Sequence, residues 1–229
     1  MTWTLRAVLA ALIAGTCWSG AAFAGPAGPM VVRLNPGYGG VCDSCDLSAR
    51  ILSGARLSGG VFSRSDFSRS AMDGANGAGG VFEEANFTRA DLSRARLSNA
   101  KLRKAKFSSA ILAHSDATGA ELDGADFTNA ELQFANFSQA SLKGTVFLAA
   151  RAPQANFLGA ELKRADFTMA ALQQADFTGA NLTEAKLVQA NLRGANLASA
   201  RGLTQRQLKS ACGDADTRLP AGLSIAACH

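Results

Sequence analysis

The chain has 229 residues, of which 48% are hydrophobic, and its formal net charge is +5. The positive net charge argues against a protein whose whole surface is acidic. Beyond the first 24 residues, no segment is long and apolar enough to cross a bilayer, which argues against a membrane-spanning mature protein.

Residues 1–24 have the three regions of an export signal. A short positively charged start is followed by an apolar run at 7–15 and by an A-x-A cleavage site at 22–24. Lipidation at Cys17 and a buried N-terminal helix are the alternatives. We therefore expect a mature chain that starts near Gly25 and lies in the periplasm or outside the cell.

Residues 25–44 are rich in Gly and Pro around a short apolar segment at 30–34. We interpret them as an N-terminal cap over the repeats that follow. Such a cap is needed because the terminal unit of a repeat protein exposes apolar side chains and an unpaired strand edge.

Residues 45–200 repeat every five residues without an insertion. From Leu57 to Leu197, 26 of the 29 positions spaced by five hold Leu, Phe or Met. The exceptions are Gly77, Ala117 and Ala152. A small residue stands two positions earlier, and Asp or Asn often stands one position earlier. An α-helix would spread the bulky residues round all its sides, and a continuous strand would alternate their faces. The chain must therefore turn once per pentad, with the small and bulky side chains inside.

The number of pentads in one coil follows from sorting the bulky residues at a spacing of twenty. This spacing gives one unbroken column of Phe67, Phe87, Phe107, Phe127, Phe147 and Phe167. Like residues stack on like when each coil has four sides. The repeats then make about eight coils and a rod roughly 37 Å long, at ~4.8 Å per coil.

The recurring A-(D/N)-(L/F)-x-x pattern, as in Ala-Asp-Phe-Thr-Asn at 125–129 and Ala-Asn-Leu-Thr-Glu at 180–184, resembles the pentapeptide-repeat family. The resemblance covers residues 45–200 and implies an all-β fold, a right-handed quadrilateral parallel β-helix. The best-characterised members of that family mimic duplex DNA with an acidic rod and bind topoisomerase. The net positive charge and the export signal argue against that activity here.

Four cysteines follow the export signal, namely Cys42, Cys45, Cys212 and Cys228. An even number in an exported chain favours disulfides. The two pairs lie at opposite ends of the rod, so we predict Cys42–Cys45 and Cys212–Cys228. A C-x-x-C redox centre lacks the βαβ pattern that usually surrounds it, and a zinc site lacks further ligands nearby.

Two features of the repeats bear on binding. The bulky residue is missing at Gly77 and Ala117, which predicts a packing gap filled by neighbours, with a shallow ligand groove as the alternative.

Charge is unevenly distributed along the repeats. Residues 50–106 hold 11 Lys/Arg against 5 Asp/Glu, and residues 116–184 hold 4 Lys/Arg against 9 Asp/Glu. A solvated surface explains this, and so does a basic face that binds an anionic partner. That candidate face consists of Arg89, Arg94, Arg96, Lys101, Arg103, Lys104 and Lys106.

Residues 201–229 leave the repeat pattern and form the predicted C-terminal cap. Thr204 and Gln207 have capping-box spacing, which predicts a short helix from about Gln205, ended by Gly213. Leu203 and Leu208 would cover the last coil.

No motif supports an enzyme, a cofactor or a metal. His114, Ser115 and Asp116 are adjacent, but adjacent residues on an extended pentad point to different sides. Nucleic-acid binding is disfavoured because exposed aromatic residues do not interleave with the basic cluster. We therefore expect a non-enzymatic scaffold of the cell envelope that binds a protein or another anionic partner. Thiol–disulfide exchange at Cys42 and Cys45 is the alternative, and a homodimer through an end cap stays open.

Overall fold

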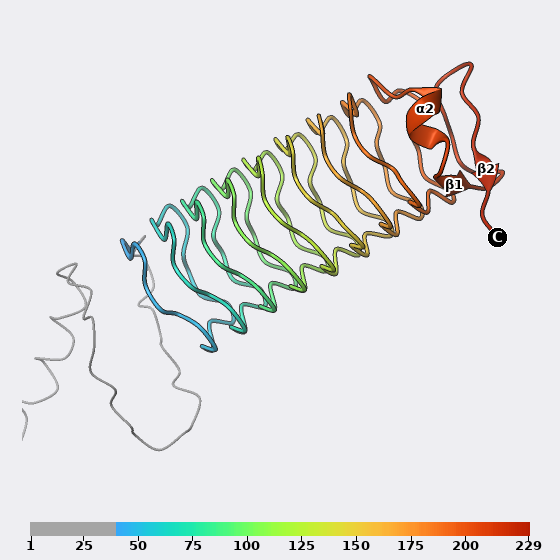
Figure 1. Cartoon of the computed structure of the whole chain (residues 1–229). Coiled ribbons are helices and arrows are strands. Elements are labelled where there is room, and N and C mark those ends of the chain that lie inside the picture. Colours follow the sequence, from blue (N-terminus) through green and yellow to red (C-terminus); the bar gives the residue numbers. More distant parts are fainter. Residues whose placement is uncertain (1–39) are drawn as a thin grey trace, which may run out of the picture.

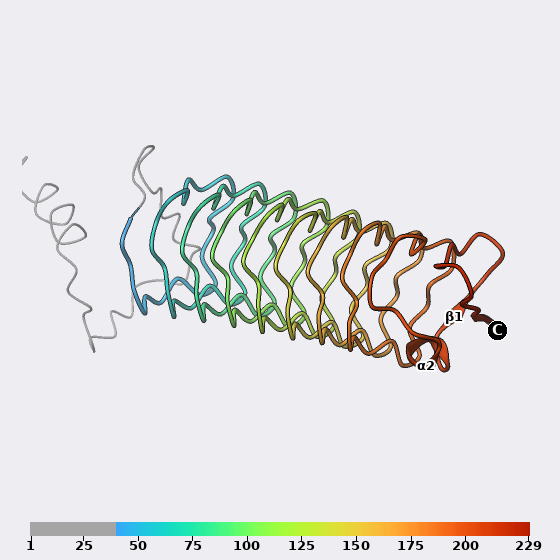
Figure 2. The ribbon, with the colours of Figure 1, turned by 90° about the horizontal axis from the view of Figure 1, so that it is seen from above.

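The computed structural model of the protein describes residues 40–229, which form a long rod of stacked coils (Figure 1). The predicted export signal at 1–24 lies outside the described residues, as does the predicted cap at 25–44 except for its last five residues. A view turned by 90° shows the same stack from above, with the C-terminal segment at one end (Figure 2).

Each coil contains four pentads. Parallel bridges join residues twenty apart along the whole repeat, such as Val41 with Val61 and Asp66 with Asn86. Within the repeats, the bridging residue stands just before the position that usually holds the bulky residue. The predicted spacing of twenty is therefore confirmed.

The sides of the rod are shorter than ordinary strands. Every bridge in the repeats is isolated, because a turn follows each bulky residue and leaves too few extended residues for a continuous strand. Among the described residues, continuous strands are found only as β1 (Cys212–Gly213) and β2 (Ala226–Ala227), which pair in parallel after the repeats.

The corners are β-turns with a left-handed residue. At one of them, the Ala55 N–H donates to the Leu52 carbonyl oxygen at 2.9 Å, and Gly54 has a φ of 66°. Large side chains also occupy this turn position, as Arg94 and Phe134 do with φ of 57° and 58°. Their backbone is held from the next coil, as when the Arg94 N–H donates to the Ala113 carbonyl at 2.9 Å.

The Asp and Asn residues of the repeat cap these turns. The Thr128 N–H donates to Oδ1 of Asp126 at 2.9 Å, and the Thr128 hydroxyl donates to the same oxygen at 2.6 Å. Equivalent backbone bonds recur at other corners, as from Ser68 to Asp66 at 2.8 Å. This side-chain acceptor serves the N–H of the first turn residue, which would otherwise lack a protein partner.

The core is the stack of inward side chains. The six phenylalanines of the predicted column lie ring on ring, with centroids 4.7–5.1 Å apart and interplanar angles of 4–9°. A second column meets the first edge-on, as where Phe167 contacts Phe177 at 5.8 Å and 89°. Both arrangements are favourable for aromatic quadrupoles, so the stack contributes more than its buried area alone.

The missing bulky residue at Gly77 leaves no open groove. A Cβ atom added there would lie 3.1 Å from Cδ2 of Leu97 and 3.1 Å from the Phe82 ring. Ala117 is likewise buried. Neighbouring side chains therefore fill the gap at Gly77, as the packing interpretation predicts.

The C-terminal segment continues the coil after the pentad pattern ends. Helix α2 (Gln205–Leu208) begins where expected, and Leu208 is buried against the core. Backbone bridges then join Asn191 to Cys212 and Asn196 to Arg218, beyond the boundary predicted at 200. The expectation that Gly213 ends the helix is wrong, because α2 ends at Leu208 and Gly213 lies in β1.

Helix α2 is tied to the last repeats by one side chain. The amide nitrogen of Gln207 donates to the carbonyl oxygens of Leu182 and Ala185, at 2.8 and 2.9 Å. Its amide oxygen accepts from the Thr204 N–H at 2.9 Å. Gln207 therefore anchors the helix to the coil below it as well as satisfying the helix start.

Candidate functional site

The adjacent His114, Ser115 and Asp116 do not converge. The His114 ring lies at a corner and stacks on Phe134 at 4.7 Å, with an interplanar angle of 5°. Ser115 points into the core, where it is buried and its hydroxyl has no hydrogen-bond partner in the described chain. Asp116 instead accepts from the N–H and hydroxyl of Thr118. The three side chains therefore do not form a catalytic triad.

Two kinds of site are absent from residues 40–229, the described part of the chain. Within that range, no group of three or more His, Cys, Asp or Glu side chains is placed to hold a metal ion. In the same part of the chain, no helix has the length and apolar character needed to cross a membrane.

The seven basic residues of the candidate face are all exposed, but they do not share one side. Residues on one side of the rod are twenty apart, and these seven fall within one stretch from Arg89 to Lys106. They therefore run almost once around the rod, as a basic belt made of Arg89, Arg94, Arg96, Lys101, Arg103, Lys104 and Lys106. The largest group on a single side and its corner is Lys101, Arg103 and Lys104.

Ion pairs already engage part of the basic belt. Arg94 contacts Asp73 at 3.1 Å, and Arg103 contacts Glu121 at 2.7 Å. Within the described chain, Lys101 and Lys104 make no ion pair closer than 4.0 Å. The free charges for a partner on this side are therefore those of Lys101 and Lys104.

The first cysteine pair lies at the N-terminal corner of the rod. Cys42 and Cys45 are joined, with Cα atoms 5.6 Å apart. The Ser65 hydroxyl donates to the Cys42 carbonyl at 2.6 Å and accepts from the Cys45 N–H at 3.1 Å. The pair thus closes one turn that the next coil also holds.

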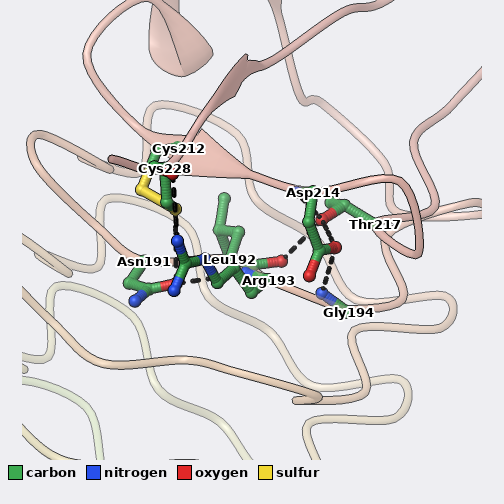
Figure 3. Close-up of a disulfide and its surroundings, with 8 residues drawn as sticks. All are labelled: Asn191, Leu192, Arg193, Gly194, Cys212, Asp214, Thr217 and Cys228. Carbon is green, nitrogen blue, oxygen red and sulfur yellow. Dashed lines mark hydrogen bonds between the residues drawn. A yellow bond between two sulfur atoms is a disulfide. The ribbon is translucent and has the colours of Figure 1, made fainter.

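The second cysteine pair holds the C-terminal tail against the last coil (Figure 3). Cys212 and Cys228 are joined, with Cα atoms 4.8 Å apart, and the Cys228 N–H donates to the Gly213 carbonyl at 2.9 Å. The Arg193 guanidinium donates to the Cys228 carbonyl at 2.9 Å. Both cysteine pairs therefore follow the connectivity expected from the sequence.

A carboxylate makes a second link between tail and coil. Oδ1 of Asp214 accepts from the Gly194 N–H at 2.8 Å, and Thr217 bonds both Asp214 and the Leu192 carbonyl (Figure 3). The bond from Gly194, with those from Thr217 and Asp216, lowers the pKa of Asp214. The tail is therefore fixed by hydrogen bonds on both sides of the disulfide.

Beside these links lies a hollow of about 530 Å³ between the last repeats and the tail. Its charged lining residues are Arg193, Asp214, Asp216 and Arg218, and its amide side chains are Gln173, Gln174 and Asn196. Sequence patterns missed this hollow because the tail that closes it carries no repeat motif.

The backbone pairing and the core of the rod define a class of protein. A chain whose coils close every twenty residues around stacked Phe and Leu is a β-helical solenoid built from pentads.

Family comparison agrees with that class. A model described as a pentapeptide repeat region matches residues 120–197, and a model described as pentapeptide repeats (8 copies) matches residues 42–76 and 81–116. Together these matches cover more than half of the chain, which therefore belongs to the pentapeptide-repeat family. Proteins of this family are non-enzymatic scaffolds. Comparison with curated proteins returned no match.

Solved structures resemble the rod. A trypsin-treated form of QnrB1, a plasmid-mediated fluoroquinolone resistance protein, is 20% identical with a TM-score of 0.56, over 77% of this chain and 92% of that chain. HetL from the cyanobacterium Nostoc, a pentapeptide repeat protein involved in heterocyst differentiation regulation, is 28% identical with a TM-score of 0.44, over 81% and 89%. The likeness to QnrB1 supports a right-handed β-helix, and it is evidence for the fold alone.

Proposed function

We propose that this protein is an exported, non-enzymatic scaffold that binds a partner protein along its rod. The observation that carries the proposal is the unbroken pairing at a spacing of twenty, from Val41 to Arg201. Such pairing fixes every outward side chain at a constant height on one of four sides. A rigid surface of this kind binds without first ordering its own side-chain framework, which lowers the entropy loss on association.

The export part of the proposal rests on residues 1–24 and on the cysteines. All four cysteines of residues 40–229 are paired, which suits an oxidising compartment. We propose the periplasm or the extracellular space. The measurement is fractionation of cells that produce the full chain with a C-terminal tag, followed by mass spectrometry of its N-terminus. A mature start near Gly25 supports export, and an intact start in the cytosolic fraction contradicts it.

We propose Lys101 and Lys104 as the binding surface. Their charges are exposed, share one side with its corner, and have no ion-pair partner within the described chain. The proposed partner carries a complementary acidic surface, because opposite charges steer association and fix orientation. Arg94 is a poor probe of this surface, since a reversed charge there would repel Asp73.

The test is chemical crosslinking and capture of partners with the tagged full chain and with a Lys101→Glu/Lys104→Glu variant. Loss of a partner from the variant, with the same melting temperature, supports the surface. Arg89→Glu is the matched control, because it reverses a charge of the basic belt on another side of the rod. An identical partner set for all three chains would exclude this surface.

Binding of topoisomerase through DNA mimicry is less well supported. The likeness to QnrB1 concerns the fold, while the net charge of +5 and the basic belt oppose mimicry of a polyanion.

An insulin-reduction assay distinguishes thiol–disulfide exchange at Cys42 and Cys45 from a purely structural disulfide. Activity that disappears in Cys42→Ser/Cys45→Ser would favour exchange over a structural role.

A further inference from the structure

The hollow at the C-terminal end of the rod is lined mainly by charged and amide side chains. Its position is fixed by three links already described: the Cys212–Cys228 disulfide, the bond from Arg193 to Cys228, and the bond from Gly194 to Asp214. Its volume is about 530 Å³, and it is open to solvent with a mainly polar lining. The hollow is therefore a preformed space rather than a gap between loosely held segments.

Two opposite charges line this hollow without meeting each other. Asp216 and Arg218 are both exposed, and neither side chain makes an ion pair or a hydrogen bond within the described chain. By contrast, the carboxylate of Asp214 and the guanidinium of Arg193 are already engaged. Asp216 and Arg218 are thus the two charged lining side chains that make no hydrogen bond or ion pair within the described chain.

The short separation of Asp216 and Arg218 along the chain favours a small ligand that carries both charges. Asp216 and Arg218 are two residues apart, so their Cα atoms are separated by at most about 7 Å. An extended dipeptide carries its ammonium and carboxylate groups over a similar length. The guanidinium of Arg218 can hold a carboxylate with two parallel hydrogen bonds, which adds orientation to charge.

Amide groups also line the hollow. Gln173 and Gln174 come from the coil below and have no side-chain hydrogen bond within residues 40–229. A primary amide both donates and accepts, which matches a peptide group. Gly194 lies directly beside Gln174, since a Cβ atom at Gly194 would be 3.2 Å from Cγ of Gln174.

We propose that this hollow binds a zwitterion of dipeptide size, with its carboxylate on Arg218, its ammonium on Asp216 and its peptide group on Gln173 or Gln174. The site is separate from the basic belt and does not depend on the proposed scaffold function. Either proposal can fail without affecting the other.

The test uses the purified chain and dialanine, followed by saturation-transfer NMR and isothermal titration. The result expected is saturable binding, with affinity at least about tenfold higher than for N-acetylalanine, which lacks the ammonium, and for alanine methylamide, which lacks the carboxylate. Equal binding of all three compounds, or no saturation by about 10 mM dialanine, would overturn the proposal.

Variants locate the site. Arg218→Gln and Asp216→Asn should each weaken dialanine binding by about tenfold or more. Both keep the backbone bridge between Asn196 and Arg218, so neither should change the melting temperature by more than a few degrees. Arg206→Gln is the matched control, because Arg206 is an exposed arginine of the same segment that does not line the hollow. Unchanged affinity in Arg218→Gln and Asp216→Asn, or an equal loss in Arg206→Gln, would contradict the assignment.

Discussion

The Phe82 ring occupies the space in which a side chain of Gly80 would lie. A Cβ atom at Gly80 would be 2.6 Å from Cε2 of Phe82, closer than any ordinary contact. The same relationship recurs one coil below, where a Cβ at Gly60 would be 2.5 Å from the Phe62 ring. Glycine therefore stands at 60 and 80, where this column carries phenylalanine, and alanine stands at 100 and 120, where it carries leucine.

Gly80→Ala should therefore destabilise the rod. The added methyl group must displace a fully enclosed ring, which costs about 1–3 kcal/mol. Chemical denaturation measures this loss. The double variant Gly80→Ala/Phe82→Leu should recover part of it, since leucine beside alanine is the usual pair in this repeat. No difference in stability between Gly80→Ala and the natural chain would contradict the packing described here.

Asp126 should make stability depend on pH. Burial raises the pKa of its carboxyl, but hydrogen bonds from Thr128 and Ser108 and the charge of Lys106 outweigh burial, so the pKa is lowered. The native state then favours the ionised form. The stabilisation is complete above the ordinary aspartate pKa of about 3.9 and is lost as the pH falls through the lowered pKa.

Substitution separates the charge of Asp126 from its hydrogen bonds. Asp126→Asn keeps an oxygen for the Thr128 N–H and should flatten the part of the acid-unfolding curve that belongs to this residue. Asp126→Ala removes the acceptor and should lower stability at neutral pH by about 1–2 kcal/mol. Unfolding curves at pH 7 and at pH 3 distinguish the two. Equal stability of all three chains at both values would rule out the turn-capping role.

The stability of the left-handed corner at Met169 should depend on which side chain is present there. Its φ is 60° and 56% of the residue is exposed, so the backbone conformation rather than packing decides the outcome. Met169→Val should destabilise by about 1–2 kcal/mol, because a branched Cβ fits this conformation poorly. Met169→Asn, whose side chain tolerates the conformation, is the matched control and should be neutral or slightly stabilising in thermal unfolding. The reverse order would contradict the assigned turn.

The two disulfides should differ in their contribution. Chain entropy predicts about 3 kcal/mol for the sixteen-residue separation of Cys212 and Cys228, and about 2 kcal/mol for Cys42 and Cys45, which are three residues apart. Cys212→Ser/Cys228→Ser should also speed hydrogen exchange in residues 213–228 while the central coils stay protected. Uniformly faster exchange along the rod would show instead that the tail controls global stability.

The repeat made the interior of the rod predictable. The bulky side chain of each pentad identifies the core. Sorting these residues at a spacing of twenty predicts from the sequence alone that Phe107 stacks on Phe127. The core depends only on which residues share a column, and the sequence contains that information directly. The capping of turns by Asp126 and its equivalents was not predicted, although their regular place before the bulky residue was visible.

The outer surface was less well predicted. The sequence predicts one basic face, yet at a spacing of twenty Arg89 and Lys101 belong to different sides of the rod. The tail is a different case. Cys212 and Arg218 pair with the last coil although no pentad pattern marks them, so tertiary contacts decide their position. The hollow beside Arg218 depends on that pairing and on the disulfide, which sequence spacing does not reveal.

Because partners in the backbone ladder are twenty residues apart, the length of this chain can change safely only in certain steps. Removing twenty residues, such as 121–140, would shorten the rod by one coil of ~4.8 Å and keep every downstream side chain on the same side of the rod. Removing five would preserve the sequence motif yet rotate everything that follows by a quarter turn, so that Phe and Leu columns no longer align. Gene rearrangements in multiples of four pentads can therefore adjust the reach of this protein while preserving its pattern of sides.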